Sequence, residues 1–248
     1  MKLCAAVFLA GFAFCGFSAE KLFLLAEDGF NEFLKEDFHR LGLNRQKDVE
    51  CKLSSFPEPG LSPVLRIGKE PVPENCESVL FAVRGYFFFC NEENPVKELT
   101  AEETEQVLTG KFLCWKDTRV PLKQICYAGK EDLKRKVPGK GDPAWVRVPD
   151  PGLALQMVAE DLTALAVVPL IAAGTTVRGT KLLPVAGVIP TPKTVMNGTY
   201  PAVKRYFLSV RKDAPPEIRA VYERLRSKYT RAKLWNAGIL PAVEGDGK

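Results

Sequence analysis

The stretch that decides the expected fold runs from Asn94 to Asp117 and reads NPVKELTAEETEQVLTGKFLCWKD. Thr100 can cap a helix that starts at the next residue, because its hydroxyl can accept a hydrogen bond from the amide of Glu103. The Glu103 carboxylate can return that bond and complete a capping box. Gly110 suits the left-handed backbone position that ends a helix. The stretch therefore predicts a helix over residues 101–108.

A second stretch further along the chain runs from Gly187 to Arg205 and reads GVIPTPKTVMNGTYPAVKR. Pro190 and Pro192 exclude a long helix here, because proline cannot donate the helical hydrogen bond. The Asn197-Gly198 pair favours a tight turn. The YFLSV that follows at 206–210 is rich in strand-forming side chains. This part of the chain therefore predicts a strand, a turn and a strand.

Together the two stretches resemble the phosphate-type solute-binding proteins of bacterial ABC importers, which have type 2 periplasmic-binding-protein-like domains. Those proteins commonly carry an Asn-Pro, a Leu-Thr that opens a helix, and a Gly-Lys turn followed by Trp. Later they carry a Gly-Val-x-Pro-Thr and a Tyr-Pro, and Arg205 stands near the family's Arg. The resemblance covers residues 79–241. It implies an α/β fold of two lobes, with mixed central sheets flanked by helices and two hinge crossings.

The resemblance also implies how the chain is divided. The outward crossing is expected at about Arg84 to Asn94, and residues 182–185 are expected to return to the first lobe. We expect a signal peptide at 1–19, lobe 1 at 20–85 and 170–248, and lobe 2 at 86–169.

The N-terminus has the pattern of a secretory signal peptide. Lys2 is followed by an apolar run from Leu3 to Phe17, and Ser18-Ala19 precede the charged Glu20. The alternative is a transmembrane anchor, but the run is shorter than the roughly 20 residues that span a bilayer. We therefore expect a periplasmic or secreted protein.

The composition limits the kinds of ligand and partner that we expect. The formal net charge of +5 falls to +4 if Lys2 is lost with the signal peptide, which suits a small anionic ligand. Lys and Arg cluster at 203–233, interleaved with apolar residues as on the wet face of a helix, so we expect no nucleic-acid partner. Of seven cysteines, five follow the signal peptide, which allows at most two disulfides. Neither their spacing nor the lone His39 matches a metal site, and we expect no metal, no cofactor and a monomer.

The rest of the chain supplies the other elements that such a fold needs. Apolar runs and helical periodicities place them as follows. We expect strands at 22–25, 64–68, 79–83, 86–90, 124–128 and within 161–169, and helices around 30–41, 154–160 and 215–232.

The resemblance implies that the loop after the first strand forms one wall of the ligand cleft. Asp28, Gly29 and Phe30 occupy that loop, at the start of the helical pattern. Backbone amides and the positive end of a helix dipole can bind an anion at such a place. Asp28 would repel phosphate if it pointed inward, and would cap the helix if it did not.

Four further residues are candidates by position. Lys69 follows the strand at 64–68, and Arg84 stands at the expected hinge. Gly129 and Lys130 follow the strand at 124–128, where the resembled family has an Arg-x-x-x-Ser-Gly-Thr element that holds the oxyanion. Here that element is missing, since the chain reads GKEDLKRKV.

We therefore expect an exported substrate-binding protein, without enzymatic activity, that captures phosphate or a related oxyanion for an ABC-type importer and its inner-membrane permease. An alternative is a protein of the same fold whose ligand site has degenerated, leaving an envelope adaptor or sensor. A third hypothesis is a secreted hydrolase that uses a cysteine; the sequence has no Gly-x-Ser-x-Gly elbow and no P-loop.

Overall fold

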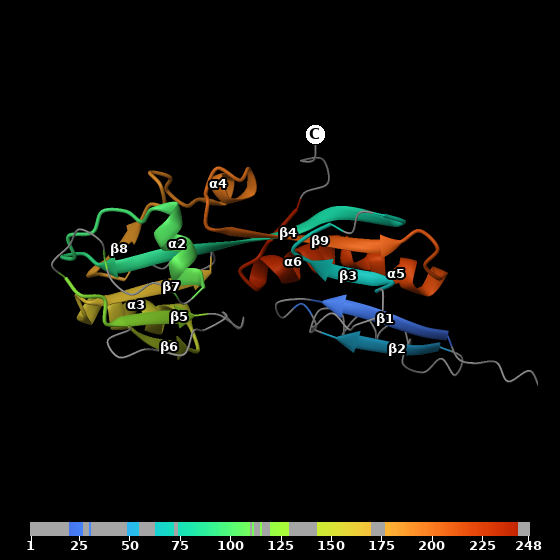
Figure 1. Ribbon diagram of the computed structural model, residues 1–248, viewed down its shortest axis with the longest axis horizontal. Helices are drawn as coiled ribbons and strands as arrows, with labels where there is room; N and C mark the ends of the chain where they lie inside the picture. Colours follow the sequence, from blue (N-terminus) through green and yellow to red (C-terminus); the bar gives the residue numbers. More distant parts are fainter. Residues whose placement is uncertain are drawn as a thin grey trace, which may run out of the picture.

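The fold is built on one mixed sheet that runs through the whole molecule (Figure 1). The computed structural model describes residues 20–26, 30, 49–54, 63–71, 74–109, 111, 115, 120–128, 143–169 and 177–242. The strand order is β2-β1-β3-β9-β4-β7-β5-β6, and β8 and β10 also pair with β4. The strands are β1 (Glu20–Ala26), β2 (Val49–Ser54), β3 (Leu65–Gly68), β4 (Cys76–Asn91), β5 (Gln124–Ala128), β6 (Ala144–Val148), β7 (Ala164–Pro169), β8 (Thr180–Leu183), β9 (Val203–Arg211) and β10 (Leu240–Pro241).

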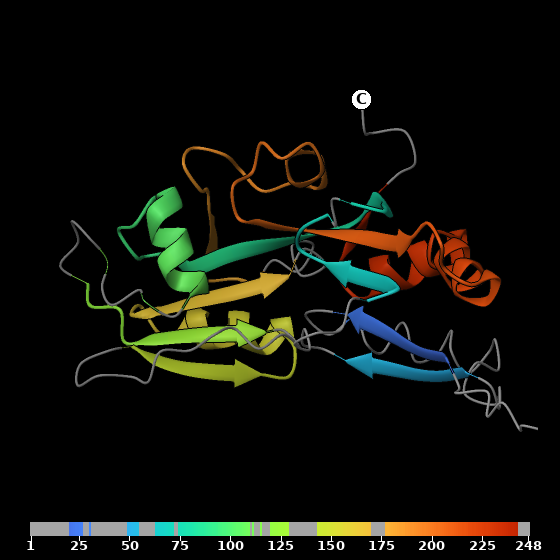
Figure 2. The same cartoon turned by 45° about the vertical axis from the view of Figure 1, so that its right-hand side comes forward.

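The molecule has two lobes joined at a narrow middle, as Figures 1 and 2 both show. The first lobe holds β1, β2, β3 and most of β9, and the second holds β5, β6, β7 and β8. The strand β4 belongs to both, because its first part pairs with β9 and its last part with β7 and β8. The expected two-lobed α/β fold with a mixed sheet is confirmed.

The crossing strand is longer than expected. Sequence analysis placed two strands, 79–83 and 86–90, on either side of Arg84-Gly85, but the structure has one uninterrupted strand. Gly85 stays extended within it and lies against α4 (Pro192–Met196), since a Cβ added to Gly85 would meet the Val195 side chain at 3.0 Å. The glycine thus permits close packing and does not break the strand.

The helix predicted at 101–108 is confirmed as α2 (Ala101–Leu108). The Glu103 amide donates to the Thr100 hydroxyl at 3.1 Å, and the Thr100 amide donates to the Glu103 carboxylate at 2.9 Å. This is the expected capping box. Gly110, the expected end of the helix, lies outside the described residues.

The helix expected at 215–232 is wrong as a single element. The structure has α5 (Pro216–Leu225) and α6 (Lys228–Asn236), and Ser227 caps the second by accepting from the amide of Thr230. The chain turns at Arg226, and the Ser227 hydroxyl then satisfies one of the free amides in the first turn of the new helix. In the second lobe, α3 (Pro151–Glu160) covers the helix predicted around 154–160.

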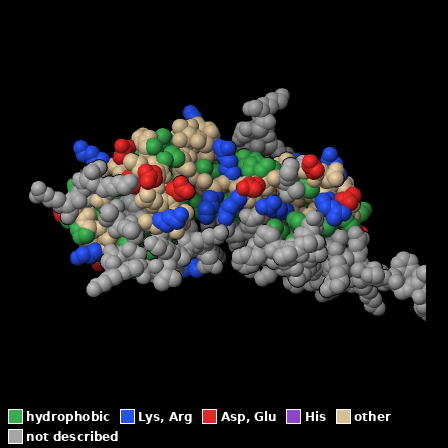
Figure 3. All heavy atoms as spheres, viewed as in Figure 1, with side chains coloured by type: hydrophobic (Ala, Val, Ile, Leu, Met, Phe, Trp, Pro, Cys, Tyr) green, Lys and Arg blue, Asp and Glu red, His purple; other side chains and the backbone are tan. Residues whose placement is uncertain are grey.

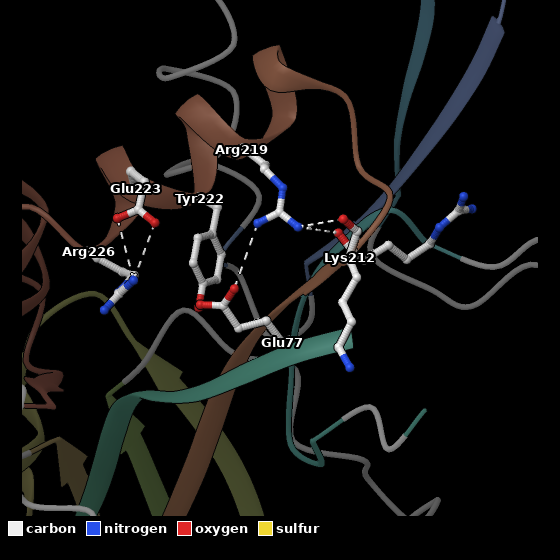
Figure 4. Close-up of polar contacts among 7 residues, drawn as sticks. Glu77, Lys212, Arg219, Tyr222, Glu223 and Arg226 are labelled. Carbon is white, nitrogen blue, oxygen red and sulfur yellow. Dashed lines mark hydrogen bonds and ion pairs between the residues drawn. The ribbon is translucent and has the colours of Figure 1, made fainter. Parts of the chain in front are cut away.

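A set of polar contacts connects α5 with the first part of β4 (Figure 4). The Tyr222 hydroxyl donates to Glu77 at 3.0 Å, and Arg219 lies 3.7 Å from the same carboxylate. Arg219 also donates to the carbonyl of Lys212 at 2.6 Å, where β9 has ended. The helix is therefore fixed to both long strands of the first lobe.

The apolar core has two parts that follow the lobes. One cluster includes Phe87, Phe88 and Val167, and the other includes Leu65, Tyr206 and Val221. Residues 180–202 were expected in lobe 1, yet β8 pairs with the second-lobe end of β4, and Leu183, Val185, Val195 and Tyr200 belong to the second-lobe cluster. We propose that the return to the first lobe occurs at about residue 202, whereas the other expected boundaries stay predictions.

Candidate ligand site at the junction of the two lobes

The junction lies at the carboxyl ends of strands from both lobes. In the first lobe β1 runs parallel to β3, and in the second β5 runs parallel to β6 and β7. The arrowheads of β1 and β3 point toward those of β5, β6 and β7 across the middle of the molecule (Figure 1). Loops at the carboxyl ends of parallel strands are where α/β proteins usually bind ligands.

Arg84 occupies the crossing strand at this junction and rests on two aromatic rings. Its guanidinium carbon lies 5.8 Å from the centre of the Phe30 ring and 5.7 Å from that of Tyr206. Both rings are buried, and they pack on each other with centres 4.7 Å apart. Aromatic faces attract a cation at such distances, so the charge of Arg84 is held at a fixed place.

Lys204 stands directly beside Arg84. The two are register partners in the β4–β9 pair, and each is half-buried. The Lys204 ammonium lies 5.2 Å from the centre of the Tyr86 ring, which is almost fully buried. Two neighbouring positive charges are therefore held on the two strands that connect the lobes.

The second lobe brings a buried phenol and a third cation to the same place. Tyr127 of β5 is 4% exposed, and its register partner on β6 is Arg147. Burial raises the pKa of Tyr127, while the charges of Arg84, Lys204 and Arg147 oppose the rise. Tyr127 and Arg147 are thus neighbours near the carboxyl ends of β5 and β6, and Arg84 and Lys204 are neighbours on β4 and β9. We call Arg84, Lys204, Arg147 and Tyr127 the junction cluster.

The surface view agrees with this placement. Figure 3 shows Lys and Arg side chains gathered near the middle of the molecule, where the two lobes meet. Positive charges from both lobes at one place favour an anion between them, since an anion lowers their mutual repulsion.

The structure brings together two of the residues expected at the site, Phe30 and Arg84. Lys69 is exposed, directly after β3, at the end of that strand that faces the junction. The other expected residues, Asp28, Gly29, Gly129 and Lys130, lie outside the described residues.

Sequence analysis missed Lys204, Tyr127 and Arg147. Lys204 could be found only from the pairing of β9 with Arg84. The single signal for Arg147 is that it interrupts the otherwise apolar β6, which reads AWVRV. Arg205, which matches the Arg of the resembled motif, is instead exposed and lies over Gly198, where an added Cβ would collide with its guanidinium group.

The Asn94-Pro95 turn, which belongs to the first of the two resembled stretches, has a structural role in the second lobe. The side chain of Asn94 is 1% exposed; it donates to the carbonyl of Leu162 at 2.8 Å and accepts from the Val96 amide at 2.9 Å. Lys181 of β8 donates to the backbone carbonyl of Asn94. The Asn-Pro turn therefore holds β8, the α3–β7 loop and the end of β4 together.

The N-terminus of α3 follows β6 at the junction, where a helix dipole could attract an anion. Asp150 already caps it, because its carboxylate accepts from the Leu153 amide at 3.1 Å. A negative side chain at that place competes with an anionic ligand for the same amides.

The described thiols are not activated. Cys76, Cys90 and Cys126 are free, and burial raises the pKa of each, that of Cys90 to about 11. A cysteine nucleophile needs a lowered pKa, so these three do not fit a hydrolase. Within the described ranges, no His, Cys, Asp and Glu side chains group as metal ligands would, and no helix is long and apolar enough to cross a bilayer.

Comparison with known structures identifies the architecture. A "possible phosphate binding protein" from Planctomyces limnophilus superposes with a TM-score of 0.68 at 13% identity, over 91% of this chain and 94% of its own. PstS from Borrelia burgdorferi gives 0.59 at 12% identity, over 90% and 98%. An ABC-type phosphate transport receptor from Vibrio cholerae gives 0.58 at 13% identity, over 88% and 99%. The chain has the type 2 periplasmic-binding fold.

No family model matches the sequence, and no curated protein matches it either. The likeness is therefore one of fold, and the resemblance seen in the sequence is confirmed at that level. The junction cluster stands between the two lobes, and ligand sites occur preferentially at such interfaces.

Proposed function

We propose that this chain is an exported solute-binding protein that holds a small anion between its lobes. The observation that carries the proposal is the junction cluster, in which Arg84 and Lys204 are paired on the crossing strands and Arg147 stands near the end of β6 that faces them. Phosphate or a related oxyanion fits three cations better than a neutral solute does, because charge-assisted hydrogen bonds are stronger than neutral ones.

The structural neighbours support this proposal by their own names, since they include an ABC-type phosphate transport receptor and a possible phosphate binding protein. By analogy, we propose that the mature chain acts outside the cytoplasm as a monomer, catalyses no reaction, and delivers its ligand to a permease in the inner membrane. Closure of the lobes on the ligand would provide the signal that the permease recognises.

A second candidate is an adaptor or sensor that has kept the fold and lost the ligand. Two observations favour it: Arg84 already rests on Phe30 and Tyr206, and the α3 N-terminus is capped by Asp150. Both groups would have to give up interactions to bind an anion.

Ligand-induced stabilisation separates the two candidates. We would measure the melting temperature of residues 20–248 against phosphate, sulfate, molybdate, phosphonates and small carboxylates. A true binder gains on the order of 2.7 kcal/mol of stability at a hundredfold excess of ligand over Kd. No shift with any anion would reject the binding proposal and favour the adaptor.

Matched variants then locate the site. Arg84→Gln and Lys204→Gln should each weaken anion binding about ten- to a hundredfold, because a hydrogen bond to a charged group is lost. Lys123→Gln is the control, because Lys123 is exposed and precedes β5 at the end of the strand away from the junction. If Lys123→Gln weakened binding equally, the anion would be bound by the general charge of the protein and not by the junction cluster.

A further inference from the structure

The helix α6 presents two exposed aromatic side chains that the proposed function does not use. Trp235 is 52% exposed and Tyr229 is 47% exposed, among the most exposed large apolar side chains of the described residues. Only Thr230 and Leu234 of this helix are buried. With 3.6 residues per turn, Lys228, Tyr229, Ala232, Trp235 and Asn236 lie on the side opposite the buried pair, and all five are exposed. We call these five residues the α6 face.

The segment of the chain that contains this face is strongly basic. Residues 216–236, which contain α5 and α6, carry six cations and two carboxylates. That excess of four nearly equals the formal charge of +5 of the whole chain. The cations are Arg219, Arg224, Arg226, Lys228, Arg231 and Lys233, and the carboxylates are Glu217 and Glu223.

Aromatic and cationic side chains are mixed on this face. Lys228 belongs to this face, and the half-buried Lys233 flanks it with its ammonium 5.0 Å from the centre of the Tyr229 ring. Tyr and Trp, with an apolar ring and one polar atom, concentrate at the boundary between lipid and water. Lys and Arg in the same region attract anionic lipid headgroups.

We propose that the α6 face docks on the surface of an anionic phospholipid bilayer. Trp235 and Tyr229 enter the headgroup layer, and Lys228 and Lys233 pair with lipid phosphates, while the helix lies in the plane of the surface. A short helix suffices for such contact, whereas a stable protein partner would need about 800 Å² of surface on each side. The helices α5 and α6 lie against one side of the first-lobe sheet (Figure 2).

The experiment is co-sedimentation of residues 20–248 with lipid vesicles. Vesicles of phosphatidylglycerol mixed with phosphatidylcholine should bind the protein, and vesicles of phosphatidylcholine alone should bind it about tenfold less. High salt should release the protein, because salt screens surface charge. Equal binding to both vesicle types, or to neither, would overturn the proposal.

Variants test whether α6 is responsible. Trp235→Ser and Lys228→Glu should each reduce the bound fraction several-fold, and together about tenfold or more, without loss of secondary structure in circular dichroism. The matched control is Ile189→Ser with Lys193→Glu, because Ile189 is 59% exposed and Lys193 is exposed on the other lobe. If the control pair reduced binding as much as the α6 pair, the α6 face would not be the docking site.

Two more measurements separate lipid docking from the binding of an acidic protein and from a disturbed fold. A soluble polyanion, polyglutamate, should compete only weakly with vesicles; full displacement at equal charge concentration would point to an acidic protein as partner and overturn the lipid proposal. The anion-induced melting shift should be unchanged in Trp235→Ser and Lys228→Glu, which keeps this test independent of the junction cluster. A changed shift would mean that the variants disturb the fold, and the inference would then fail.

Discussion

The two parts of β4 differ although they belong to one strand. In the first lobe its residues 76–80, CESVL, are all at least partly exposed, whereas in the second lobe residues 86–90, YFFFC, are all buried. The second part pairs with β7 and β8 and has apolar side chains on both of its faces, as a strand in the centre of a layered fold does. One strand thus runs from a partly exposed start in the first lobe to a fully buried stretch in the second.

The difference coincides with the position of a charged residue in the strand. Between Val79 and Cys90 the strand has one charged residue, Arg84, at the change from one part to the other. A cation this close to a core needs compensation, and the rings of Phe30 and Tyr206 supply it. The charge of Arg84 therefore lies next to the point where the partner of β4 changes from β9 to β7.

Truncation of a core side chain should show the largest contrast between the two parts. Phe88→Ala removes a fully buried ring and should cost about 3–5 kcal/mol of unfolding free energy. Val79→Ala removes less volume at a partly exposed position and should cost about 1 kcal/mol. Urea unfolding measures both, and equal losses would contradict the contrast.

The cysteines at the two ends of the strand should differ in their response to alkaline pH. Burial raises the pKa of Cys90 from 9.0 to about 11, so the folded state keeps a proton that the unfolded state has lost. This stabilisation is present below pH 9, is lost as the pH rises through 11, and amounts to about 3 kcal/mol.

Cys90→Ala isolates that contribution. Between pH 9 and 11 its unfolding free energy should fall less steeply than that of the unchanged chain, whereas Cys76→Ala, at the partly exposed end, should follow the unchanged chain more closely. Denaturant unfolding at several pH values measures the slopes. Parallel curves for the Cys90 variant and the unchanged chain would refute the assigned cause.

The link between α4 and the crossing strand should have an intermediate effect. The Tyr200 hydroxyl donates to the Tyr86 carbonyl at 2.7 Å, just beyond Gly85 and Val203, where the β4–β9 ladder ends. Tyr200→Phe leaves that buried carbonyl without this donor and should cost about 1–2 kcal/mol. Thermal unfolding checks the value, with Tyr229→Phe at an exposed position as a control expected to change little.

The ion pair on the first part of β4 should matter least. Glu77 and Arg219 are both partly exposed and 3.7 Å apart, so Glu77→Gln should cost about 0.5 kcal/mol. The glutamine can still accept from the Tyr222 hydroxyl, which separates charge from hydrogen bonding. Unfolding in low and high salt measures the effect, and a loss that high salt leaves unchanged would argue against an ion-pair origin.

Local chemistry made much of the fold predictable. Thr100 and Glu103 specified the start of α2, and the run at 124–128 specified β5, because both depend on neighbours in the sequence. The break at Ser227 was missed because the apolar positions of α5 continue into α6 without a glycine or proline between them. The lobe to which residues 182–185 belong depends on the pairing of β8 with β4, and these two strands are far apart in the sequence.

The site was less predictable than the fold. Arg84 and Phe30 were predicted by position and lie together in the structure, but the resembled Arg205 packs on a turn, and its neighbour Lys204 lies beside Arg84. Adjacent strand residues point to opposite faces, so a shift of one position in a motif decides which side chain reaches the site. Only the register of β9 against β4 settles that question.

The connection between the lobes is itself a two-stranded ribbon. Val83, Arg84 and Gly85 pair with residues 205, 204 and 203, so β4 and β9 are hydrogen-bonded where they cross. Such a ribbon resists stretching and shearing and yields most easily to twist. Any rotation of one lobe against the other therefore turns Arg84 and Lys204 together, as a unit, so their spacing stays constant while their angle to Tyr127 changes.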